Sequence, residues 1–383
     1  MDDKRIKIIH VINCLSPGGA ERMLFNLLAN ADMDKFDIKV LSLQDKGQLY
    51  SDIKKLGVPV YCFSMFHKID FIFKFIKLIY TIHKLKPDII HTWMYHSNII
   101  AGFAAKIVSR CKIVWSIHAS KLDAGFTKRS TKIAIKLSSL MSFFIPHKII
   151  FCSNSSYYLH QIIGFDNSKM AVVPNGVDLK LFKKSNANKL ELINKINNED
   201  NTIFIGMAAR YDPMKGYDIF IRSAKILCEK YSNVHFLLCG SNVTNSNHEL
   251  VKMIIDDNLV SRIHLLGYIS DMPKFYNSIN ILTVASSYGE AFPMSICEAM
   301  SCEVPVVSSD LGDCSYIIND SEMIFPINNA EILSKRWEKI ITHDEEIKHK
   351  IGKKNRERIM SLFEIKNIEK TYEKNYLEVL NNN

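Results

Sequence analysis

Short runs rich in β-branched residues alternate with longer segments of helical period along almost the whole chain. This alternation is typical of parallel β-sheets whose strands are joined by helices that cover both faces of the sheet. Twelve runs are predicted as strands, in two series of six. They are residues 7–13, 36–43, 59–63, 88–93, 112–118 and 148–153, and then 202–208, 234–240, 263–268, 281–286, 304–309 and 322–327.

The two series predict two doubly wound α/β domains. The chain has 383 residues, whereas a single hydrophobic core rarely grows beyond about 250–300 residues. The turn formed by Pro174, Asn175 and Gly176, with the polar segment after it, marks the junction. We therefore expect an N-terminal domain over residues 1–178 and a C-terminal domain over 179–365. A last helix, 366–383, is expected to pack back on the first domain.

Open parallel sheets bind ligands at the carboxyl ends of their strands, beside helix N-termini. Gly18 and Gly19 follow the first predicted strand and precede the first predicted helix, 20–31. Glycines there let a ligand or a facing backbone approach closely, and the free N–H groups suit an anion. The spacing differs from GxGxxG, which argues against a nicotinamide or flavin site. A turn that needs glycine only for its geometry is an equally good interpretation.

Two further junctions between a strand and a helix carry charged side chains. Arg210 and Lys215 follow the first strand of the second series, where two cations predict an anion site or, alternatively, solvated loop charges. Glu290 lies in a later loop, Pro293 is expected at the first helical position, and Glu298 lies one turn inside that helix. Two carboxylates in this arrangement suit a ligand with two sets of vicinal hydroxyls, such as a sugar and a ribose joined by a diphosphate.

The positive charge is concentrated in the front half of the chain. Residues 1–178 contain 24 lysines and arginines against 13 aspartates and glutamates, and the remaining residues contain 25 against 27. An anionic partner of the front half is therefore expected: membrane lipid, a charged acceptor or nucleic acid. The basic residues form no recognisable nucleic-acid module, so nucleic acid is not predicted as a partner.

The cysteines and the N-terminus predict a cytoplasmic protein. The nine cysteines are scattered in apolar surroundings without the spacing of a metal site or a disulfide framework. The N-terminus does not resemble a signal peptide, and no run of 18 apolar residues is present. Asp32 and Asp34 form a single Asp-X-Asp pair, but they lie in a polar loop after the first predicted helix. We therefore predict no metal ion.

Several stretches together resemble the retaining glycosyltransferases of family 4, which have the GT-B fold of two Rossmann-like domains facing across a cleft. The resemblance extends in order over nearly the whole chain. The matching stretches are PGGAE (17–21), AARYDPMKGYD (208–218), SSYGEAFPMSICEAMSCEVPVV (286–307) and SDLGDCSYII (309–318), with WMYHSN (93–98) and VWSIHAS (114–120) matching a subset of the family.

The resemblance implies a role for each site residue. Arg210 and Lys215 would hold the pyrophosphate of the donor, Glu290 would touch the donor sugar, and Glu298 would hold the ribose. Ala291, Phe292, Pro293 and Met294, between the two glutamates, are included in the donor site, and Gly18 and Gly19 would close it from the other domain. His118, at the end of a predicted strand, would lie beside the reacting sugar and the acceptor. We therefore name His118 and Glu290 as the catalytic candidates, with His91 and His96 as weaker ones.

The implied reaction is a metal-independent hexosyl transfer with retained configuration, from a nucleotide sugar, with UDP favoured, to a glycan or lipid-linked acceptor. No cofactor is expected, and same-face attack through an ion-pair-like state is the favoured mechanism. Two positions depart from the family pattern, because Ala291 and Glu303 stand where glycine is usual. Many relatives also carry a glutamate near Tyr316.

Two basic, apolar segments of the front half bear on the acceptor. Segment 70–84 has a narrow lysine-rich stripe on an otherwise apolar helix, and Lys128, Arg129, Lys132 and Lys136 form a second stripe. Such helices can lie on an anionic bilayer, or they can pack on a sheet with their lysines in water. The first interpretation predicts peripheral contact with the inner face of the cytoplasmic membrane and a lipid-linked acceptor, as in capsule, lipopolysaccharide or teichoic-acid assembly.

Two other classes of function remain open from the sequence. The chain could bind a nucleotide sugar without turnover, or it could be an epimerase or a phosphorylase built on similar sheets. The presence of Arg210, Lys215, Glu290 and Glu298 argues against lost turnover. A phosphorylase is expected to be longer and to carry a pyridoxal-phosphate lysine.

Overall fold

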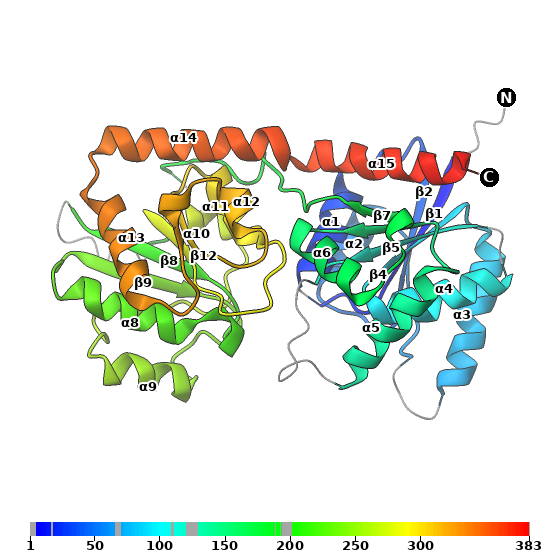
Figure 1. The fold of residues 1–383 in the computed structure, drawn as a ribbon, viewed down its shortest axis with the longest axis horizontal. Helices are drawn as coiled ribbons and strands as arrows, with labels where there is room; N and C mark the ends of the chain where they lie inside the picture. Colours follow the sequence, from blue (N-terminus) through cyan, green and yellow to red (C-terminus); the bar gives the residue numbers. More distant parts are fainter. Residues whose placement is uncertain are drawn as a thin grey trace. The chain divides into compact units, whose positions relative to one another are not determined.

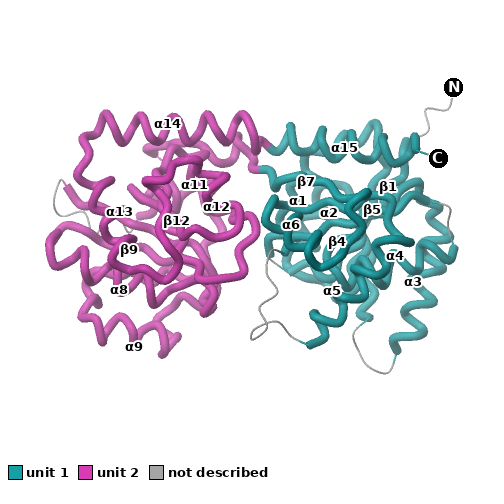
Figure 2. The backbone as a smooth tube through the Cα atoms, in the orientation of Figure 1, with its two compact units in different colours: residues 1–176, 365–383 teal, residues 177–364 magenta. Residues whose placement is uncertain are grey.

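The computed structural model describes residues 5–16, 18–65, 70–108, 111–119, 129–187, 189–191, 193 and 201–382. The chain forms two compact units, each built on its own parallel β-sheet (Figures 1 and 2). Unit 1 comprises residues 1–176 and 365–383, and unit 2 comprises residues 177–364. The predicted class, α/β with two Rossmann-like domains, is confirmed.

Unit 1 has a seven-stranded parallel sheet in the order β3-β2-β1-β4-β5-β6-β7. The strand order reverses between β1 and β4. Its elements are β1 (Ile6–Ile12), α1 (Gly19–Asn30), β2 (Phe36–Ser42), α2 (Leu49–Lys55), β3 (Val60–Cys62), α3 (Phe71–Leu85), β4 (Ile89–Trp93), α4 (Tyr95–Val108), β5 (Lys112–Ile117), α5 (Arg129–Ser142), β6 (Lys148–Phe151), α6 (Asn154–Ile163), a 3₁₀ turn (Asn167–Lys169), β7 (Met170–Val172) and α15 (Ile365–Asn381).

Alternate residues of the unit 1 strands supply two separate cores, one on each face of the sheet. Ile8 and Ile12 of β1 pack with the apolar sides of α1, α2 and α15. Ile9 and Val11 pack on the other face, with buried residues of α3, α4 and α5. This alternation follows from the two-residue period of a strand. Helix α15 therefore belongs to the layer that also contains α1, with Tyr372 and Tyr376 buried in it.

Unit 2 has a six-stranded parallel sheet in the order β10-β9-β8-β11-β12-β13, so its strand order reverses between β8 and β11. The aromatic contact of Trp337 with Phe220, at 5.1 Å between ring centroids, joins α13 to α8. The elements are β8 (Ile203–Ala208), a 3₁₀ turn (Pro213–Lys215), α8 (Tyr217–Cys228), β9 (Val234–Cys239), α9 (His248–Asp256), β10 (Ile263–Leu265), α10 (Met272–Tyr276), β11 (Ile281–Val284), α11 (Met294–Ser301), β12 (Val306–Ser309), α12 (Cys314–Ile318), a 3₁₀ turn (Ser321–Met323), β13 (Ile324–Phe325), α13 (Ala330–Thr342) and α14 (Glu345–Leu362).

All twelve predicted runs contain a strand of the structure, although most strands are shorter by a residue or more at one end. Strand β7 was not predicted. It has three residues, is only partly buried and lies at the edge of the sheet, so it is too short to show a period of two.

The unit boundaries lie close to the predicted domain boundaries but do not coincide with them. The first lies between Gly176 and Val177, and the second between Glu364 and Ile365, instead of after residues 178 and 365. Val177 donates its N–H to the carbonyl of Phe363 at 2.9 Å. This hydrogen bond, which joins residues far apart in sequence, assigns Val177 to unit 2.

Candidate active site

The loops after β8 and β11 lie side by side at the carboxyl edge of the unit 2 sheet, because these neighbouring strands run parallel in register. They are also the two strands at which the strand order reverses. Open α/β sheets bind ligands at this point, since the helices after the two strands lie on opposite faces and leave room between them. The site is therefore built from these two loops.

The loop after β8 places Lys215 directly against the end of β11. Asp212 begins a 3₁₀ turn by accepting the N–H of Met214 at 3.0 Å, and the turn ends at Lys215. Gly216 then has φ +70°, and a Cβ there would lie 2.0 Å from the carbonyl oxygen of Ala285. A side chain would fill the space that this close approach requires, so glycine is needed at position 216.

Lys215 and Glu290 form an ion pair at this edge. Nζ of Lys215 donates to Oε2 of Glu290 at 2.6 Å, and Oγ of Ser286 donates to the same oxygen at 3.0 Å. Burial alone would raise the pKa of Glu290, but Lys215, Ser286 and Arg210 lower it below the usual value. Glu290 is therefore an anion at neutral pH. Both side chains line a cavity of about 20 Å³, enough for one water-sized group.

Arg210 and Glu290 both lie at this edge, but Arg210 pairs with a different carboxylate. Nη2 of Arg210 lies 3.2 Å from Oδ2 of Asp212, and the Arg210 side chain is 60% exposed. An exposed pair of this kind is weak, because water competes for both groups. The guanidinium can therefore leave Asp212 for a phosphate at little cost, and its planar fork matches two phosphate oxygens.

Glu298 lies in α11, about one turn from the start of the helix. Helix α11 begins at Met294, and Pro293 precedes it as the capping residue; the prediction placed Pro293 one position too far inside. The hydroxyl of Tyr276 donates to Oε2 of Glu298 at 2.7 Å, and burial together with Glu298 raises the pKa of Tyr276 well above its usual value. This hydrogen bond fixes one carboxylate oxygen of Glu298.

The loop between the two glutamates is held by its backbone. Ala291 and Phe292 are buried, and the Ala291 carbonyl accepts the N–H of Asp313 at 3.0 Å. Gly312 has φ +59°, and a Cβ there would lie 2.4 Å from the carbonyl oxygen of Glu290. The segment after β12 therefore supports the Glu290 loop. The alanine at position 291, where the family usually has glycine, is accommodated at an 8% exposed position.

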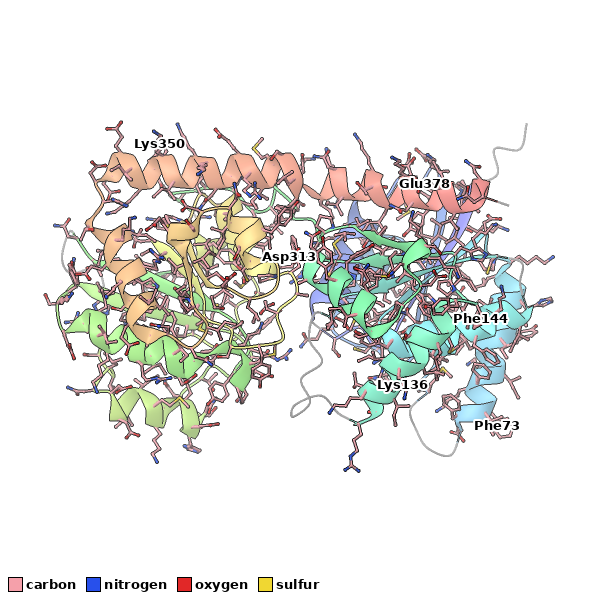
Figure 3. The ribbon with its side chains drawn as sticks, viewed as in Figure 1. Phe73, Lys136, Phe144, Asp313, Lys350 and Glu378 are labelled. Atoms are coloured by element: carbon pink, nitrogen blue, oxygen red, sulfur yellow. The ribbon has the colours of Figure 1, made fainter. Side chains whose placement is uncertain are left out.

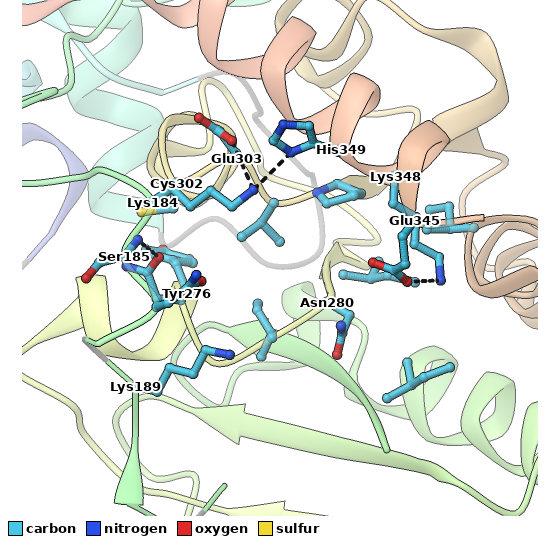
Figure 4. A pocket seen from close by; sticks show the side chains of 18 of the residues that line it. Lys184, Ser185, Lys189, Tyr276, Asn280, Cys302, Glu303, Glu345, Lys348 and His349 are labelled. Carbon is cyan, nitrogen blue, oxygen red and sulfur yellow. Dashed lines mark hydrogen bonds and ion pairs between the residues drawn. The ribbon is translucent and has the colours of Figure 1, made fainter. Parts of the chain in front are cut away.

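Glu303 shows why glycine is usual at its position, since its φ of +61° lies in the left-handed region. It also lies away from the donor loops. Glu303 pairs with Lys184 at 3.2 Å in a pocket of about 300 Å³ at the amino ends of β8, β11 and β12 (Figure 4). This is the opposite end of the strands from Lys215 and Glu290, so the departure at Glu303 does not touch the candidate site.

At the carboxyl edge of the unit 1 sheet, the two glycines of the first loop differ. Gly18 precedes α1 and Gly19 begins it. A Cβ at Gly19 would meet nothing within 4 Å, whereas one at Gly18 would lie 2.4 Å from the Glu21 carboxylate. Burial raises the pKa of Glu21. The first turn of α1 therefore already holds a carboxylate of its own chain, and Glu21, within the stretch 17–21, was missed by the sequence analysis.

His118 follows β5 at the same edge. The His118 ring stacks on Trp93, with ring centroids 5.1 Å apart. The backbone N–H of His118 donates to Sδ of Met94. Met94 directly follows β4 and has φ +71°, a strained value for this residue type. Burial lowers the pKa of His118 to about 4, although Asn175 opposes this shift. The imidazole is therefore neutral at pH 7. Within the described residues, neither ring nitrogen forms a hydrogen bond of good geometry, although the Asn175 side chain lies close enough to raise the pKa.

Two asparagines that the sequence analysis did not select belong to this edge. Asn13 directly follows β1, and Ile12, Trp93 and Ser116 lie level across β1, β4 and β5. Asn175 lies in the turn after β7, which is held against α1 because Asn26 donates to the Gly176 carbonyl. Oδ1 of each asparagine is buried and, in the part of the chain that is described, forms no hydrogen bond of good geometry, although the Asn175 side chain acts on the His118 ring. The sequence carried a signal for both, since Asn13 ends a predicted strand and Asn175 lies in the junction turn.

His91 and the pair of Asp32 and Asp34 are explained by local structure. Nδ1 of His91 is hydrogen bonded to Tyr376 at 2.8 Å and Nε2 to Ser116 at 2.6 Å, so this buried histidine is structural. Oδ1 of Asp32 accepts the N–H groups of Asp34 and Lys35, as in an ordinary turn. Over the described ranges, no three His, Cys, Asp or Glu side chains are grouped as metal ligands would be.

The basic candidates lie on one helix, as far as they are described. Lys128 lies outside the described residues. Arg129, Lys132 and Lys136 are on α5 and are exposed. None of the helices in the described ranges is long and apolar enough to cross a bilayer.

Two family models match the chain, one after the other. The model described as Glycosyltransferase Family 4 matches residues 17–181, and the model described as Glycosyl transferases group 1 matches residues 188–358. The first covers most of unit 1 and the second most of unit 2.

Curated proteins and solved structures are similar over nearly the full length. An N,N'-diacetylbacillosaminyl-diphospho-undecaprenol alpha-1,3-N-acetylgalactosaminyltransferase of Campylobacter jejuni is 27% identical over 89% of this chain and 92% of its own length. A UDP-Gal:alpha-D-GlcNAc-diphosphoundecaprenol alpha-1,3-galactosyltransferase of Escherichia coli is 26% identical over 94% of each chain. The crystal structure of Anabaena Alr3699/HepE in complex with UDP has a TM-score of 0.85 at 19% identity and covers 97% of this chain and 100% of that one.

Proposed function

The chain belongs to the family 4-type glycosyltransferases of the GT-B fold, and from this premise we propose that it transfers a hexosyl group from a UDP-sugar to a lipid-linked acceptor, with retention and without a metal ion. The observation that carries the proposal is the buried pair of Lys215 and Glu290 at the strand-order reversal of unit 2, with Arg210 in the same loop. This arrangement suits a diphosphate next to a sugar.

Unit 2 binds the donor. Lys215 and Arg210 take the pyrophosphate oxygens, Glu290 accepts hydrogen bonds from hydroxyls of the donor sugar, and Glu298 accepts hydrogen bonds from the ribose. Lys215 has three N–H donors, so it can contact Glu290 and a phosphate together. Charge then develops on the leaving UDP, and the two cations stabilise it where it forms.

The reaction proceeds by same-face attack. The bond between the anomeric carbon and the UDP oxygen breaks, and its electron pair goes to the β-phosphate. The acceptor oxygen then bonds to the anomeric carbon on the same face, and its proton passes to a β-phosphate oxygen of the departing UDP. Because Lys215 and Arg210 supply the positive charge, this step needs no metal ion.

Unit 1 binds uncharged groups of the substrates. His118 is neutral at pH 7, so its ring can accept a hydrogen bond at one nitrogen and donate one at the other. The Oδ1 atoms of Asn13 and Asn175 can accept hydroxyl protons. We assign these three side chains to hydroxyls of the transferred sugar and the acceptor, with His118 positioning the attacking oxygen.

Names of similar proteins support the choice of UDP and of a lipid-linked acceptor. Two relatives are named for transfer to diphospho-undecaprenol sugars, one of them from UDP-Gal, and another is named for capsular polysaccharide biosynthesis. Structural neighbours were solved with UDP and with UDP-glucose. We accordingly place the enzyme at the cytoplasmic face of the membrane, in cell-surface polysaccharide assembly.

Thermal stabilisation by UDP, with EDTA present, tests the donor site. Wild type should be stabilised by UDP and by UDP-sugars, and Glu298→Ala should lose most of the shift. Glu357→Ala, an exposed glutamate of α14, is the matched control and should keep it. No shift in the wild type would overturn the proposal. Stabilisation without sugar transfer to any lipid-linked acceptor would favour a binding protein, and an altered donor sugar would favour an epimerase.

A further inference from the structure

Helices α3, α4 and α5 form a continuous layer on one face of the unit 1 sheet, since α4 packs against both of the others (Figure 1). Among the described residues, 24 large apolar side chains are exposed, and 12 of them lie on these three helices or in the two residues that follow α5. Exposed apolar residues scattered singly are normal, but such a concentration marks an interaction surface.

Helix α3 exposes half of its apolar residues. It buries only Leu78 and Ile82 fully. Ile72 is 71% exposed, Phe73 76% and Tyr80 63%. Helix α3 does pack on the sheet, since Leu78 and Ile82 belong to its core and Phe75, Ile79 and Leu85 are partly buried against it. The interpretation of α3 as a helix packed on the sheet is therefore confirmed for one side. The other side leaves a wide apolar face without any covering element in the described chain.

Helices α4 and α5 continue this face. On α4 the exposed residues are Phe103, Lys106 and Ile107, at the spacing of one helix side. On α5 the exposed residues recur every three or four positions and end in two phenylalanines. They are Arg129, Lys132, Ile133, Lys136, Leu137, Leu140, Phe143 and Phe144.

The same three helices contain no aspartate or glutamate. Six exposed cations lie among the apolar side chains: Lys77, Lys84, Lys106, Arg129, Lys132 and Lys136. Figure 3 labels Phe73, Lys136 and Phe144, which extend from these helices. Throughout, we call the exposed residues of α3, α4 and α5, with Phe143 and Phe144, the α3–α5 face.

We propose that the α3–α5 face binds the surface of an anionic lipid bilayer. Aromatic and aliphatic side chains can enter the boundary between headgroups and acyl chains, while lysines among them meet lipid phosphates. The proposal rests on the proposed function, because a lipid-linked acceptor lies in such a bilayer. It assigns the acceptor to the unit that also carries His118.

Charge favours a bilayer over two other possible partners of this face, a second copy of the chain and nucleic acid. A second copy of the chain that docked through the same face would bring two sets of cations together without a compensating carboxylate. Nucleic acid would pair with the lysines but would leave the aliphatic side chains without partners. An anionic bilayer satisfies both kinds of side chain.

Vesicle sedimentation tests the proposal. The full-length protein should sediment with vesicles of phosphatidylcholine mixed with phosphatidylglycerol, and much less with phosphatidylcholine alone. High salt should weaken the binding only in part, because the apolar contacts persist. The double variant Phe73→Ser/Phe144→Ser should bind at least ~10-fold more weakly. Its matched control is Ile255→Ser/Val260→Ser, two residues of unit 2 that are 58% and 65% exposed.

A second pair of variants separates charge from apolar contact. Lys77→Gln/Lys136→Gln should lose the preference for anionic lipid, whereas Lys252→Gln/Lys353→Gln, two exposed lysines of unit 2, should keep it. All the substituted side chains are exposed, so the thermal stability of each variant should match the wild type.

Three results would overturn the proposal. The first is that the wild type does not sediment with vesicles at low salt. The second is that a variant and its matched control lose vesicle binding equally. The third is that the wild type binds no vesicles but self-associates, and that Phe73→Ser/Phe144→Ser abolishes this self-association. Thermal stabilisation by UDP is measured in parallel. If the protein binds UDP but not vesicles, this inference is wrong and the proposed donor site is supported. If it binds vesicles but not UDP, the proposed donor site is wrong and this inference is supported.

Discussion

At the carboxyl edge of the unit 2 sheet, charged side chains are already paired with one another, whereas at the same edge of unit 1 neutral polar atoms are buried without hydrogen bonds of good geometry in the described chain. Lys215 contacts Glu290, and Arg210 contacts Asp212. In unit 1, by contrast, Asn13, His118 and Asn175 present uncharged groups.

The difference indicates what each edge binds. A buried cation left alone is costly, so a site for an anion needs an internal counter-ion until the ligand arrives. A buried neutral amide or imidazole can remain without a hydrogen-bond partner, before the ligand binds, at a cost of about 1–3 kcal/mol. Unit 2 is therefore suited to a diphosphate, and unit 1 to hydroxyl groups.

The largest effect is expected from Lys215→Ala. Under the proposed function it removes the cation that faces the leaving UDP, so kcat/KM should fall by about 10²–10³-fold. It also leaves Glu290 buried without its partner, which should lower the free energy of unfolding by about 3 kcal/mol. Steady-state kinetics and urea denaturation measure the two effects.

The double variant Lys215→Ala/Glu290→Ala is the control for this pair. It removes both charges, so it should recover part of the lost stability but none of the activity. The pKa of Glu290 is lowered in the folded state, so the pair stabilises above the unfolded pKa and this contribution is lost as pH falls through the folded value. If the double variant is no more stable than Lys215→Ala, the ion pair of Lys215 and Glu290 does not stabilise the fold as we expect.

A smaller effect is expected at His118. His118→Ala should lower kcat by about 10²-fold, because the attacking hydroxyl loses its positioning group. In the wild type, activity should be constant near neutral pH and fall as pH approaches the His118 pKa of about 4, where the ring becomes charged. A pH–rate profile measures this. An acid limb that persists unchanged in the variant would argue against His118.

The same histidine affects stability in a predictable direction. Its folded pKa is lower than its unfolded value, so between about 4 and 6.5 only the unfolded chain holds the proton. Stability should therefore decrease as pH falls through this range, and less steeply in His118→Ala.

The smallest effect is expected from Asn175→Ala. Its Oδ1 forms no hydrogen bond of good geometry in the described residues, so its removal should change the free energy of unfolding by less than about 0.5 kcal/mol. The KM for the acceptor should nevertheless rise by about tenfold, since one hydrogen bond to a hydroxyl is worth about 1.4 kcal/mol. A large loss of stability with unchanged KM would mean that Asn175 only supports the turn.

The strand pattern and the donor motifs could be predicted because they are local. Two cations lie within six residues, from Arg210 to Lys215, and two carboxylates lie within nine, from Glu290 to Glu298. Strand β7 could not be predicted, because three partly buried residues show no period. The period of α3 was visible, but the period alone does not say which side of a helix a sheet covers.

The sequence by itself determined the two α/β units and the loops that carry the donor-site residues, because strand period, helix period and turn residues act over a few positions. Only the tertiary structure decided that Lys215 meets Glu290, 75 residues away, and that Asn13 lies level with the ends of β4 and β5. It also decided that the α3–α5 face is left uncovered. Partners and burial depend on which elements pack together, and no local pattern encodes that.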